Sequence, residues 1–409
     1  MARVVLGVAG GIAAYKSAFL LRLLTEAGHD VRVVPTASAL RFVGAATFEA
    51  LSHHPVTAEV FDDVDQVAHV RIGQEADLIV VAPATADLLA RTVHGRADDL
   101  LAATLLMARC PILLAPAMHT EMWQHPATVA NVGTLRERGV LVIPPAQGRL
   151  TGTDSGPGRL PEPAEIAELA ELVLRAGPEA LRPDLVGRRV LISAGGTREP
   201  LDPVRFLGNR SSGKQGIALA SVAAARGADV TLVVANVDAP APAGARMIEV
   251  STTDQLRVEI AREAKQADVV VMAAAVADFR PAIVSGSKIK KASSDPEPIA
   301  LTRNPDILRE LVTNRHPGQV LVGFAAETGD GEGTILEHGA TKLAAKGVDL
   351  LVVNEVGAEL AFDRPDNEAT ILSANGQQTS VPRGPKAVLA ARVWDLVSAR
   401  LSDPDPGPR

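Results

Sequence analysis

Arg3-Val-Val-Leu-Gly-Val-Ala-Gly-Gly11 and Arg189-Val-Leu-Ile-Ser-Ala-Gly-Gly196 begin the two halves of this chain of 409 residues. In each copy an apolar run typical of a buried strand enters a pair of glycines, and a stretch of helical period follows. A second apolar run comes next, at Asp30–Pro35 and at Asp229–Ala235. Strand, glycine turn, helix and strand in this order predict a right-handed βαβ crossover in each half.

Further apolar runs alternate with helical segments, at 77–82, 111–115 and 140–143, and again at 268–274, 319–324 and 349–354. This alternation predicts an α/β protein with two doubly wound, mostly parallel, Rossmann-like domains. Prolines and charges at 178–188 indicate the boundary. We therefore expect domains at residues 1–180 and 189–409, joined by a linker at 181–188. Ile371–Val381 predicts a hairpin, because Asn375-Gly376 is a strong turn signal.

The composition restricts the class of partner. The chain is 47% hydrophobic but only 3% aromatic, which suits parallel sheets of Val, Leu, Ile and Ala buried on both faces. A net charge of -7 argues against nucleic acid or an anionic membrane as a partner. Cys110 is the only cysteine, so no intrachain disulfide can form. We expect a cytoplasmic protein without a membrane span.

The first glycine pair favours a mononucleotide over a dinucleotide. Gly10 and Gly11 lie at a strand-to-helix turn, where the backbone can approach a phosphate or a flat ring. The motif is not GxGxxG, and the next strand ends in Val34-Pro35-Thr36 without an acidic residue for a ribose hydroxyl. NAD is therefore disfavoured, and either FMN or no cofactor remains open.

Three more clusters follow strands of this half, at 36–39, 82–87 and 115–123. Open α/β sheets bind ligands at the carboxyl ends of their strands, so we expect the three clusters to meet there. Hydroxyl groups and free amides in the first cluster suit a phosphate. The clusters contain the candidate residues Ser38, Ala84, Thr85, Met118 and His119.

With these clusters, the first half resembles the flavin-dependent cysteine decarboxylases, in particular the phosphopantothenoylcysteine decarboxylase part of the bifunctional bacterial coenzyme A protein. The matching segments cover most of residues 1–165: GGIAAYK, TASA, AHVRI around His69, APATADLLA, DDLLAATLLMA, PAM..EMW and GPGRL. The resemblance implies a flavodoxin-like domain in which FMN takes a hydride from the substrate cysteine, CO2 leaves, and the ene-thiolate is reduced. It implies that His69 is an active-site acid, base or carboxylate-orienting group. It implies cofactor-binding roles for Gly10, Gly11, Ser38, Ala84, Thr85, Thr104 and Met118.

The chain departs from that family at two positions. His119 stands where the family usually has an asparagine that hydrogen-bonds the substrate carboxylate, and His119 could also donate such a bond. Gly152 stands where the family often has a proton-donating cysteine, and Cys110 is no obvious substitute. Asp154 or water is then the candidate acid. The rival interpretation is release of an oxidised product with the flavin left reduced.

The second half contains an imperfect P-loop and a lysine cluster. Gly208–Gln215 follows GxxxxGK but ends in Gln, which cannot supply the hydroxyl that ligates Mg²⁺, so Walker-type chemistry is disfavoured. The cluster Lys288-Ile-Lys-Lys291 lies in a Gly/Ser/Pro-rich segment and by itself would be a solvated loop. Lys342 and Lys346 are spaced to share a helix face and could grip a triphosphate.

The second half resembles the phosphopantothenate–cysteine ligase part of the same bifunctional protein over roughly residues 188–400. The hallmarks are SAGGT, DPVRF.GN.SSGK, AAAVADF, KIKK, NPDIL and VGFAAET. The resemblance implies CTP with Mg²⁺ and an acyl-cytidylate of 4′-phosphopantothenate that cysteine captures. It implies catalytic roles for Lys288, Asn209 and Arg205, and Asp278 at the nucleotide or its metal. It implies nucleotide contacts from Ala273, Ala274, Ala275, Asp278, Lys288, Pro305, Asp306, Ile307, Leu308, Phe324, Lys342 and Lys346.

Two alternative functions stay open from the sequence, and the resemblance also implies an oligomeric assembly. The chain could be a reductase fused to a nucleotide-regulated domain, or a flavoprotein that only binds partners. The resembled decarboxylases generally trimerise with FMN at a subunit interface, and the ligases generally dimerise. That combination implies a homo-oligomer, up to a dodecamer, whose partners are otherwise small molecules: 4′-phosphopantothenate, cysteine and CTP.

Overall fold

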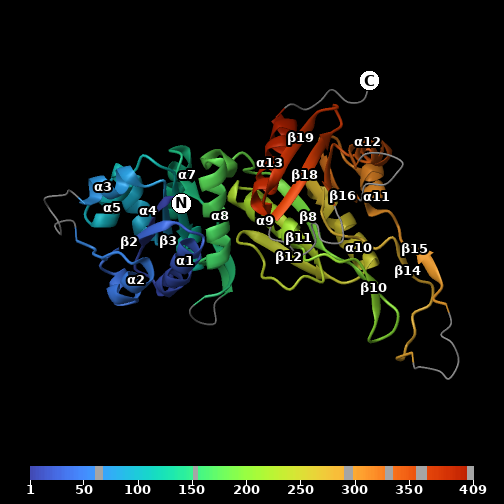
Figure 1. Cartoon of the computed structure of the whole chain (residues 1–409), viewed down its shortest axis with the longest axis horizontal. Helices are drawn as coiled ribbons and strands as arrows, with labels where there is room; N and C mark the ends of the chain where they lie inside the picture. The colour runs from blue at the N-terminus through green and yellow to red at the C-terminus, as the bar shows by residue number, and fades with distance from the viewer. Residues whose placement is uncertain (60–67, 151–154, 290–297, 328–334, 356–365, 403–409) are drawn as a thin grey trace. The chain divides into compact units, whose positions relative to one another are not determined.

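The computed structural model describes residues 1–59, 68–150, 155–289, 298–327, 335–355 and 366–402 (Figure 1). The chain forms two compact units. Unit 1 consists of Met1–Asp184 with the short pieces Ala224–Gly227 and Pro242–Gly244, and unit 2 of the remaining residues. Each unit is built on a sheet of mainly parallel strands with helices, which confirms the predicted α/β class.

Unit 1 contains a five-stranded sheet of order β2-β1-β3-β4-β5, in which neighbouring strands are parallel. This is the strand order of flavodoxin, as the sequence resemblance implied. A two-stranded antiparallel hairpin, β6–β7, is separate from the sheet. The strands are β1 (Arg3–Val8), β2 (Asp30–Pro35), β3 (Leu78–Ala84), β4 (Ile112–Pro116), β5 (Leu141–Val142), β6 (Ala146–Arg149) and β7 (Ser155–Arg159).

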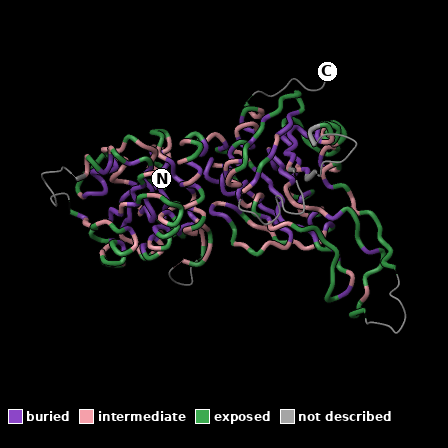
Figure 2. Tube along the Cα trace, viewed as in Figure 1, coloured by how far each residue is buried: buried purple, intermediate pink, exposed green. Residues whose placement is uncertain are grey.

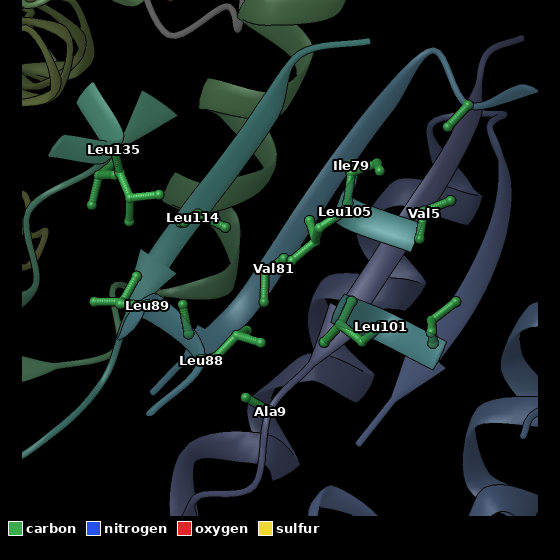
Figure 3. Packing of buried hydrophobic residues seen from close by; sticks show 14 of the residues in the cluster. Val5, Ala9, Ile79, Val81, Leu88, Leu89, Leu101, Leu105, Leu114 and Leu135 are labelled. Carbon is green, nitrogen blue, oxygen red and sulfur yellow. The ribbon is translucent and has the colours of Figure 1, made fainter. Parts of the chain in front are cut away.

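The core of unit 1 covers both faces of its sheet. Every residue of β3 is buried, and after Arg3 so is every residue of β1. One face packs Ile79, Val81 and Leu114 against Leu88, Leu101 and Leu135 from the helices (Figure 3). Burial of each such side chain is worth about 1.5–3 kcal/mol. The helices are α1 (Tyr15–Glu26), α2 (Ala45–Ser52), α3 (Ala68–Glu75), α4 (Ala86–Val93), α5 (Leu100–Met107), α6 (Thr120–Gln124), α7 (Pro126–Glu137) and α8 (Pro163–Ala176).

Unit 2 contains an eight-stranded sheet of order β12-β11-β8-β13-β16-β17-β18-β19. The first six strands of that order are parallel, and β18 and β19 are antiparallel. β18 and β19 form the predicted hairpin, in which Gly376 adopts φ 86° and donates to the Ser373 carbonyl. The strands are β8 (Arg189–Gly195), β11 (Asp229–Ala235), β12 (Ala245–Val250), β13 (Val269–Met272), β16 (Val320–Glu327), β17 (Leu350–Glu355), β18 (Asp366–Ser373) and β19 (Gln378–Pro385).

Two short strand pairs stand apart from the large sheet of unit 2. β9 (Arg198–Pro200) pairs with β10 (Phe206–Gly208), and β14 (Phe279–Pro281) pairs with β15 (Leu301–Arg303). Much of both pairs is exposed, as the green tube in Figure 2 shows at the places that Figure 1 labels β10, β14 and β15. The helices of this unit are α9 (Lys214–Ala225), α10 (Thr253–Glu263), α11 (Ile307–Asn314), α12 (Ile335–Lys346) and α13 (Lys386–Ser402). Within the described ranges, no helix is both long enough and apolar enough to cross a membrane.

Candidate functional site

A cavity of about 990 Å³ opens in unit 1 at the carboxyl ends of β1, β2, β3 and β4. Its wall combines glycine turns, hydroxyl groups and charged side chains from segments far apart in the sequence. This is the place where an open α/β sheet binds its ligand. The predicted site residues in the wall are Gly10, Gly11, Ser38, Thr85, Met118 and His119.

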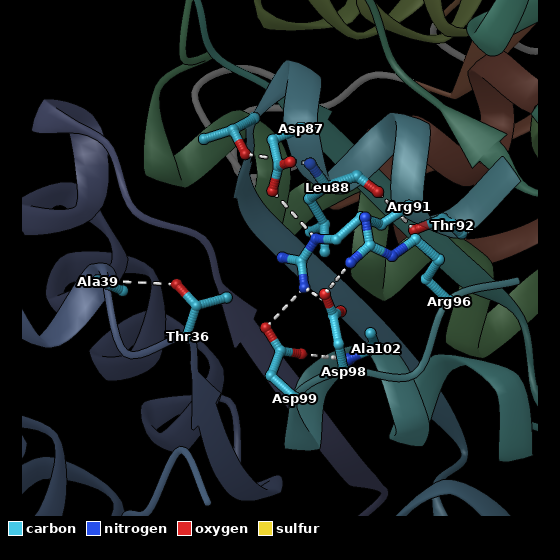
Figure 4. Close-up of polar contacts among 11 residues, drawn as sticks. Thr36, Ala39, Asp87, Leu88, Arg91, Thr92, Arg96, Asp98, Asp99 and Ala102 are labelled. Atoms are coloured by element: carbon cyan, nitrogen blue, oxygen red, sulfur yellow. Dashed lines mark hydrogen bonds and ion pairs between the residues drawn. The ribbon is translucent and has the colours of Figure 1, made fainter. Parts of the chain in front are cut away.

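The first glycine turn lies directly against the loop that follows β2. A Cβ on Gly10 would lie 2.3 Å from the Cβ of Ser38, whereas a Cβ on Gly11 would meet Thr85 Cγ2 at 3.7 Å. The Ala39 amide donates to Thr36 Oγ1 at 3.2 Å, which folds this loop into a turn (Figure 4). Gly10 therefore allows two backbone turns to approach each other at the cavity, and the resulting cradle has the shape and amides that suit a phosphate or a flavin.

The β6–β7 hairpin packs on the segment after β4. The Met118 amide donates to the Gly158 carbonyl at 2.9 Å, and a Cβ on Gly158 would lie 2.2 Å from the Met118 carbonyl oxygen. A Cβ on Gly156 would lie 2.4 Å from Thr120 Oγ1. The two glycines of the GPGRL motif thus let the hairpin lie on the Met118 segment, and Gly158, Arg159 and Leu160 join the cavity wall.

A charged network in the same wall was not predicted from the sequence (Figure 4). Arg91 pairs with Asp87 at 3.0 Å, Asp98 at 2.9 Å and Asp99 at 2.8 Å, and its side chain is 11% exposed. Burial opposes its charge, but hydrogen bonds to Asp99 and Asp98 outweigh burial and raise the pKa of the guanidinium. Asp99 also caps α5 by accepting from the Ala102 amide at 2.8 Å. Asp98 and Asp99 begin the DDLLAATLLMA motif, so the sequence motif marks both carboxylates. The motif does not include Arg91, so it does not indicate the arginine that pairs with them.

Some predicted residues of this half lie outside the cavity wall. Ala84 is buried in β3, and its carbonyl accepts from the Ala117 amide at 3.0 Å. Thr104 is fully buried in α5, and His69 is half-buried on α3, which packs against α5. Among the described residues, Thr104 Oγ1 and His69 Nδ1 are buried without a hydrogen-bond partner. Asp154 and Gly152 lie outside the described residues.

In unit 2, a buried carboxylate joins two predicted catalytic segments. Asp202 accepts from the Arg205 guanidinium at 3.0 and 2.6 Å and from the Ile289 amide at 3.1 Å. Arg205 also donates to the Ile289 carbonyl at 2.7 Å, so Arg205 and the exposed Lys288 lie on connected loops. Hydrogen bonds from Arg205 outweigh burial and hold the pKa of the Asp202 carboxyl well below its usual range. Asp202 lies in the DPVRF motif but was not singled out by sequence reasoning.

The AAAVADF segment lies at the carboxyl end of β13. The Ala274 amide donates to Ser193 Oγ at 3.1 Å, and Ala275 bridges to Gly196 of the second glycine pair. Asn209 donates from Nδ2 to the Val276 carbonyl at 3.0 Å. Asn209, Ala273, Ala274 and Ala275 therefore lie on joined loops at one edge of the sheet. Asp278 is exposed beside them, and its carbonyl accepts from the Asn304 amide at 2.8 Å.

The NPDIL segment begins α11 and contacts α12. Asp306 caps α11 by accepting from the Arg309 amide at 3.1 Å, and it pairs with Lys346. Burial opposes the charge of Asp306, but the hydrogen bond and charge of Lys346 outweigh burial and lower the pKa of its carboxyl. Ile307 is buried, while Pro305, Leu308 and Phe324 are half-buried, and Lys342 is exposed on α12. Lys346 thus carries a carboxylate partner that the sequence analysis did not foresee.

The described residues contain no group of three or more His, Cys, Asp or Glu side chains placed to hold a metal ion. The one carboxylate expected at a metal, Asp278, is exposed next to the strand end. A carboxylate in that position suits an ion that arrives with nucleotide phosphates, because Mg²⁺ usually keeps several waters and few protein ligands.

Family comparisons agree with this two-unit architecture. Residues 1–174 match the model of the Flavoprotein family, and residues 185–401 match the DNA/pantothenate metabolism flavoprotein C-terminal domain. The chain belongs to the family of bifunctional coenzyme A biosynthesis proteins. It is 60% identical to the coenzyme A biosynthesis bifunctional protein CoaBC of Mycolicibacterium smegmatis, over 98% of this chain and 99% of that protein.

More distant relatives carry the same name. The CoaBC protein of Mycobacterium tuberculosis is 58% identical over 98% of this chain and 97% of the relative, and that of Bacillus subtilis is 42% identical over 97% and 96%. Among solved structures, the C-terminal domain of a CoaBC protein is 32% identical, covers 54% of this chain and 99% of its own, and has a TM-score of 0.46. A mutant PPC decarboxylase complexed with pantothenoylaminoethenethiol is 31% identical, covers 42% and 98%, and has a TM-score of 0.40.

Proposed function

We propose that this chain makes 4′-phosphopantetheine in two steps of coenzyme A biosynthesis. Unit 2 joins 4′-phosphopantothenate to cysteine with CTP, and unit 1 decarboxylates the resulting 4′-phosphopantothenoylcysteine. The observation that carries the proposal is the 60% identity to a named CoaBC protein over nearly the whole length of both chains. We assign the decarboxylase to the domain at residues 1–180 and the ligase to residues 189–409. We place the enzyme in the cytoplasm, where a single cysteine suits a reducing compartment.

FMN is the cofactor that we propose for unit 1, and we place it at the Gly10 turn and the Ser38 loop, which meet at the cavity because Gly10 has no Cβ to collide with Ser38. When bound, FMN would supply the hydride exchange that makes the cysteine carboxylate labile. Gly11, Ser38 and Thr85 would bind it, with Met118 in the wall beside it. Ala84 and Thr104 are buried, so we propose that they support this wall from the core.

The substrate end of the cavity would be served by His119 and by a separate proton donor. His119 is exposed in the wall and can donate to a carboxylate. We propose Asp154 or water as the acid that completes the reaction, since Gly152 has no side chain. The alternative is an oxidative decarboxylase fused to an active ligase. Product mass from an anaerobic single turnover separates the two, because an oxidised product is lighter by two hydrogens.

Unit 2 would activate the carboxylate of phosphopantothenate as an acyl-cytidylate. Lys288 would stabilise charge that develops on the phosphates, and Arg205 and Asn209 would hold the acyl intermediate for attack by the cysteine amine. Asp278 would meet the nucleotide or its Mg²⁺. The AAAVADF segment (Ala273 to Ala275), the NPDIL segment (Pro305 to Leu308), Phe324, Lys342 and Lys346 would line the nucleotide pocket.

An assembly of several copies would complete the site of unit 1. On α1, Tyr15, Phe19 and Leu23 are 52%, 59% and 36% exposed at a spacing of four residues, beside Ile12 at 61%. Ile12 and Tyr15 also line the cavity, so a second copy that covers this apolar stripe would border the site. It could supply His69, which lies outside the cavity wall of its own chain. We propose trimers through this stripe.

The exposed strand pairs of unit 2 support a second contact between copies. Phe206, Phe279 and Ile283 are 52%, 46% and 84% exposed on or next to β10 and β14. Apolar side chains of this size on two-stranded arms suit burial by a partner. We propose that unit 2 dimerises through these arms, which together with the trimers would give a dodecamer. Sedimentation of the wild type and of Phe19→Glu tests the trimer contact.

The function is tested with phosphopantothenate, cysteine and each nucleoside triphosphate in turn, with mass analysis of every product. We expect CTP and Mg²⁺ to give CMP, pyrophosphate, CO2 and phosphopantetheine. His69→Asn should stop decarboxylation and leave amide synthesis intact, whereas Lys288→Gln should stop amide synthesis and still decarboxylate added 4′-phosphopantothenoylcysteine. A yellow protein that releases neither CO2 nor pyrophosphate would instead support a partner-binding flavoprotein.

A further inference from the structure

Two cations from opposite ends of unit 1 meet at one carboxylate beside the cavity. Lys16 near the start of α1 donates to Glu162 Oε1 at 3.0 Å and to Oε2 at 3.1 Å. Arg159 at the end of β7 pairs with the same Oε1 atom. Among the described residues that form the cavity wall, Lys16 and Arg159 are present and Glu162 is not. The two cations therefore face the cavity, and the carboxylate that holds them is outside its wall.

The charges of this cluster do not balance. One carboxylate serves two cations, and the Lys16 side chain is only 13% exposed, so water compensates its charge poorly. The Arg91 network in the same wall has the opposite excess, because Asp87, Asp98 and Asp99 surround Arg91 and Arg96. An anionic ligand group would thus be attracted to Lys16 and Arg159 and repelled by the aspartates.

The chemistry of the two cations matches a phosphomonoester. Such a group carries about −1.5 to −2 charges near pH 7 and three acceptor oxygens. The planar guanidinium of Arg159 can bind two of these oxygens at once, and the Lys16 ammonium can bind as a point charge. The flavin cofactor and the substrate phosphopantothenoylcysteine, which unit 1 would hold together, both contain this group.

The position of Arg159 favours the phosphate of the substrate. Arg159 follows Gly158, whose carbonyl accepts from the Met118 amide at 2.9 Å, so it belongs to the hairpin that packs on the Met118–His119 segment. The cradle formed by Gly10 and Ser38 is the place proposed above for the flavin, in a different part of the same wall. We propose that Lys16 and Arg159 form a second phosphomonoester site, which binds the phosphate of the substrate while Glu162 keeps both side chains in place. This inference rests on the proposed decarboxylase activity of unit 1.

The test compares phosphorylated and dephosphorylated ligands on the full-length, flavin-loaded protein. KM is measured for phosphopantothenoylcysteine and for pantothenoylcysteine, and binding of phosphopantetheine and pantetheine is measured by calorimetry. Arg159→Gln and Lys16→Gln should each weaken the phosphorylated ligands about 10- to 100-fold, as expected for a lost charge-assisted hydrogen bond, and leave the dephosphorylated ligands unchanged. Arg159→Lys should give an intermediate value because it keeps the charge and loses the fork.

Flavin content, read from the absorbance of the purified variants, assigns the source of the phosphate. Retained flavin with selective loss of the phosphorylated ligand supports the substrate site. Loss of flavin without any change in the preference for the phosphorylated substrate over the dephosphorylated one would overturn that assignment. It would mean that Lys16 and Arg159 bind the flavin phosphate. Equal weakening of both substrates, or none, would overturn the phosphomonoester site itself. Arg175→Gln, which breaks a Glu171 pair on α8 away from the cavity, is the matched control. Wild-type protein inactive on both substrates would instead refute the proposed function.

Discussion

Replacing Gly10 by alanine should damage the flavin cradle, and Gly133 on α7, which is not part of the cavity wall, offers a control. The new Cβ at Gly10 would lie 2.3 Å from Ser38 Cβ and 3.0 Å from the Ser38 carbonyl carbon. Ordinary carbon contacts are about 3.5–4.0 Å, so the two turns must separate by about 1 Å or more. Overpacking of this kind costs about 1–3 kcal/mol. If the turns separate only in the flavin-free state, that cost appears as a loss of about 5- to 150-fold in FMN affinity.

The measurement is FMN affinity from quenching of flavin fluorescence, together with decarboxylation and amide synthesis on the same preparations. Gly133→Ala adds a methyl group with no heavy atom within 4 Å of it and should bind FMN within about twofold of the wild type. Amide synthesis should be unchanged in both variants, because unit 2 performs it. Equal FMN affinities for the two variants would refute the cradle, and loss of amide synthesis in Gly10→Ala would indicate general misfolding.

Three further predictions concern unit 2 and the core. Asp202→Asn should lower the free energy of unfolding measured with urea at pH 7, and this difference from the wild type should become smaller below about pH 4. The pKa of the Asp202 carboxyl is lower in the folded protein than in the unfolded chain. Its contribution to the free energy of unfolding is therefore complete above the pKa of the unfolded chain and is lost as the pH falls toward the pKa of the folded protein. A difference between variant and wild type that stays constant with pH would contradict this. Gly216→Ala would place a Cβ 2.4 Å from a side chain of β8 and should lower the free energy of unfolding by about 1–3 kcal/mol. Gly133→Ala, which has open space around it, should raise the free energy of unfolding by about 0.5–1 kcal/mol. Thermal or urea unfolding measures both changes. Lys346→Gln should raise KM for CTP about tenfold with little change in KM for cysteine. An equal rise in both KM values would show that Lys346 does not contact the nucleotide.

The regular parts of the fold were predictable because their signals are local. The strands expected at Asp30–Pro35 and Asp229–Ala235 are β2 and β11 with the same bounds, since each is a Val-rich run that ends at a turn. α8 likewise carries a local start signal, because it begins at a proline, a residue favoured in the first turn of a helix. Burial on both faces makes such runs nearly continuous in apolar residues, so the pattern is clear without any knowledge of tertiary contacts.

The short strand pairs and the charged networks could not be predicted in the same way. β10 and β15 are exposed three-residue strands without apolar alternation, and they exist only because the chain brings a partner alongside. Asp202 and Ile289 are 87 residues apart in sequence. Motifs identified the candidate residues, but only the fold shows that His69 lies outside the cavity wall and that Lys346 has an acidic partner.

The contact between Lys16 and Glu162 has a consequence for the order in which unit 1 forms. The two residues are 146 positions apart, and His29 and Glu171 are joined in the same way over 142 positions. Both contacts link the beginning of the unit to α8, its last helix. Contacts over such separations form late, because the intervening chain must first be ordered. During synthesis, which adds residues from the N-terminus, both contacts can therefore form only after α8 has left the ribosome. A nascent chain that ends before Glu162 would have the glycine cradle but would lack the Glu162 partner of Lys16.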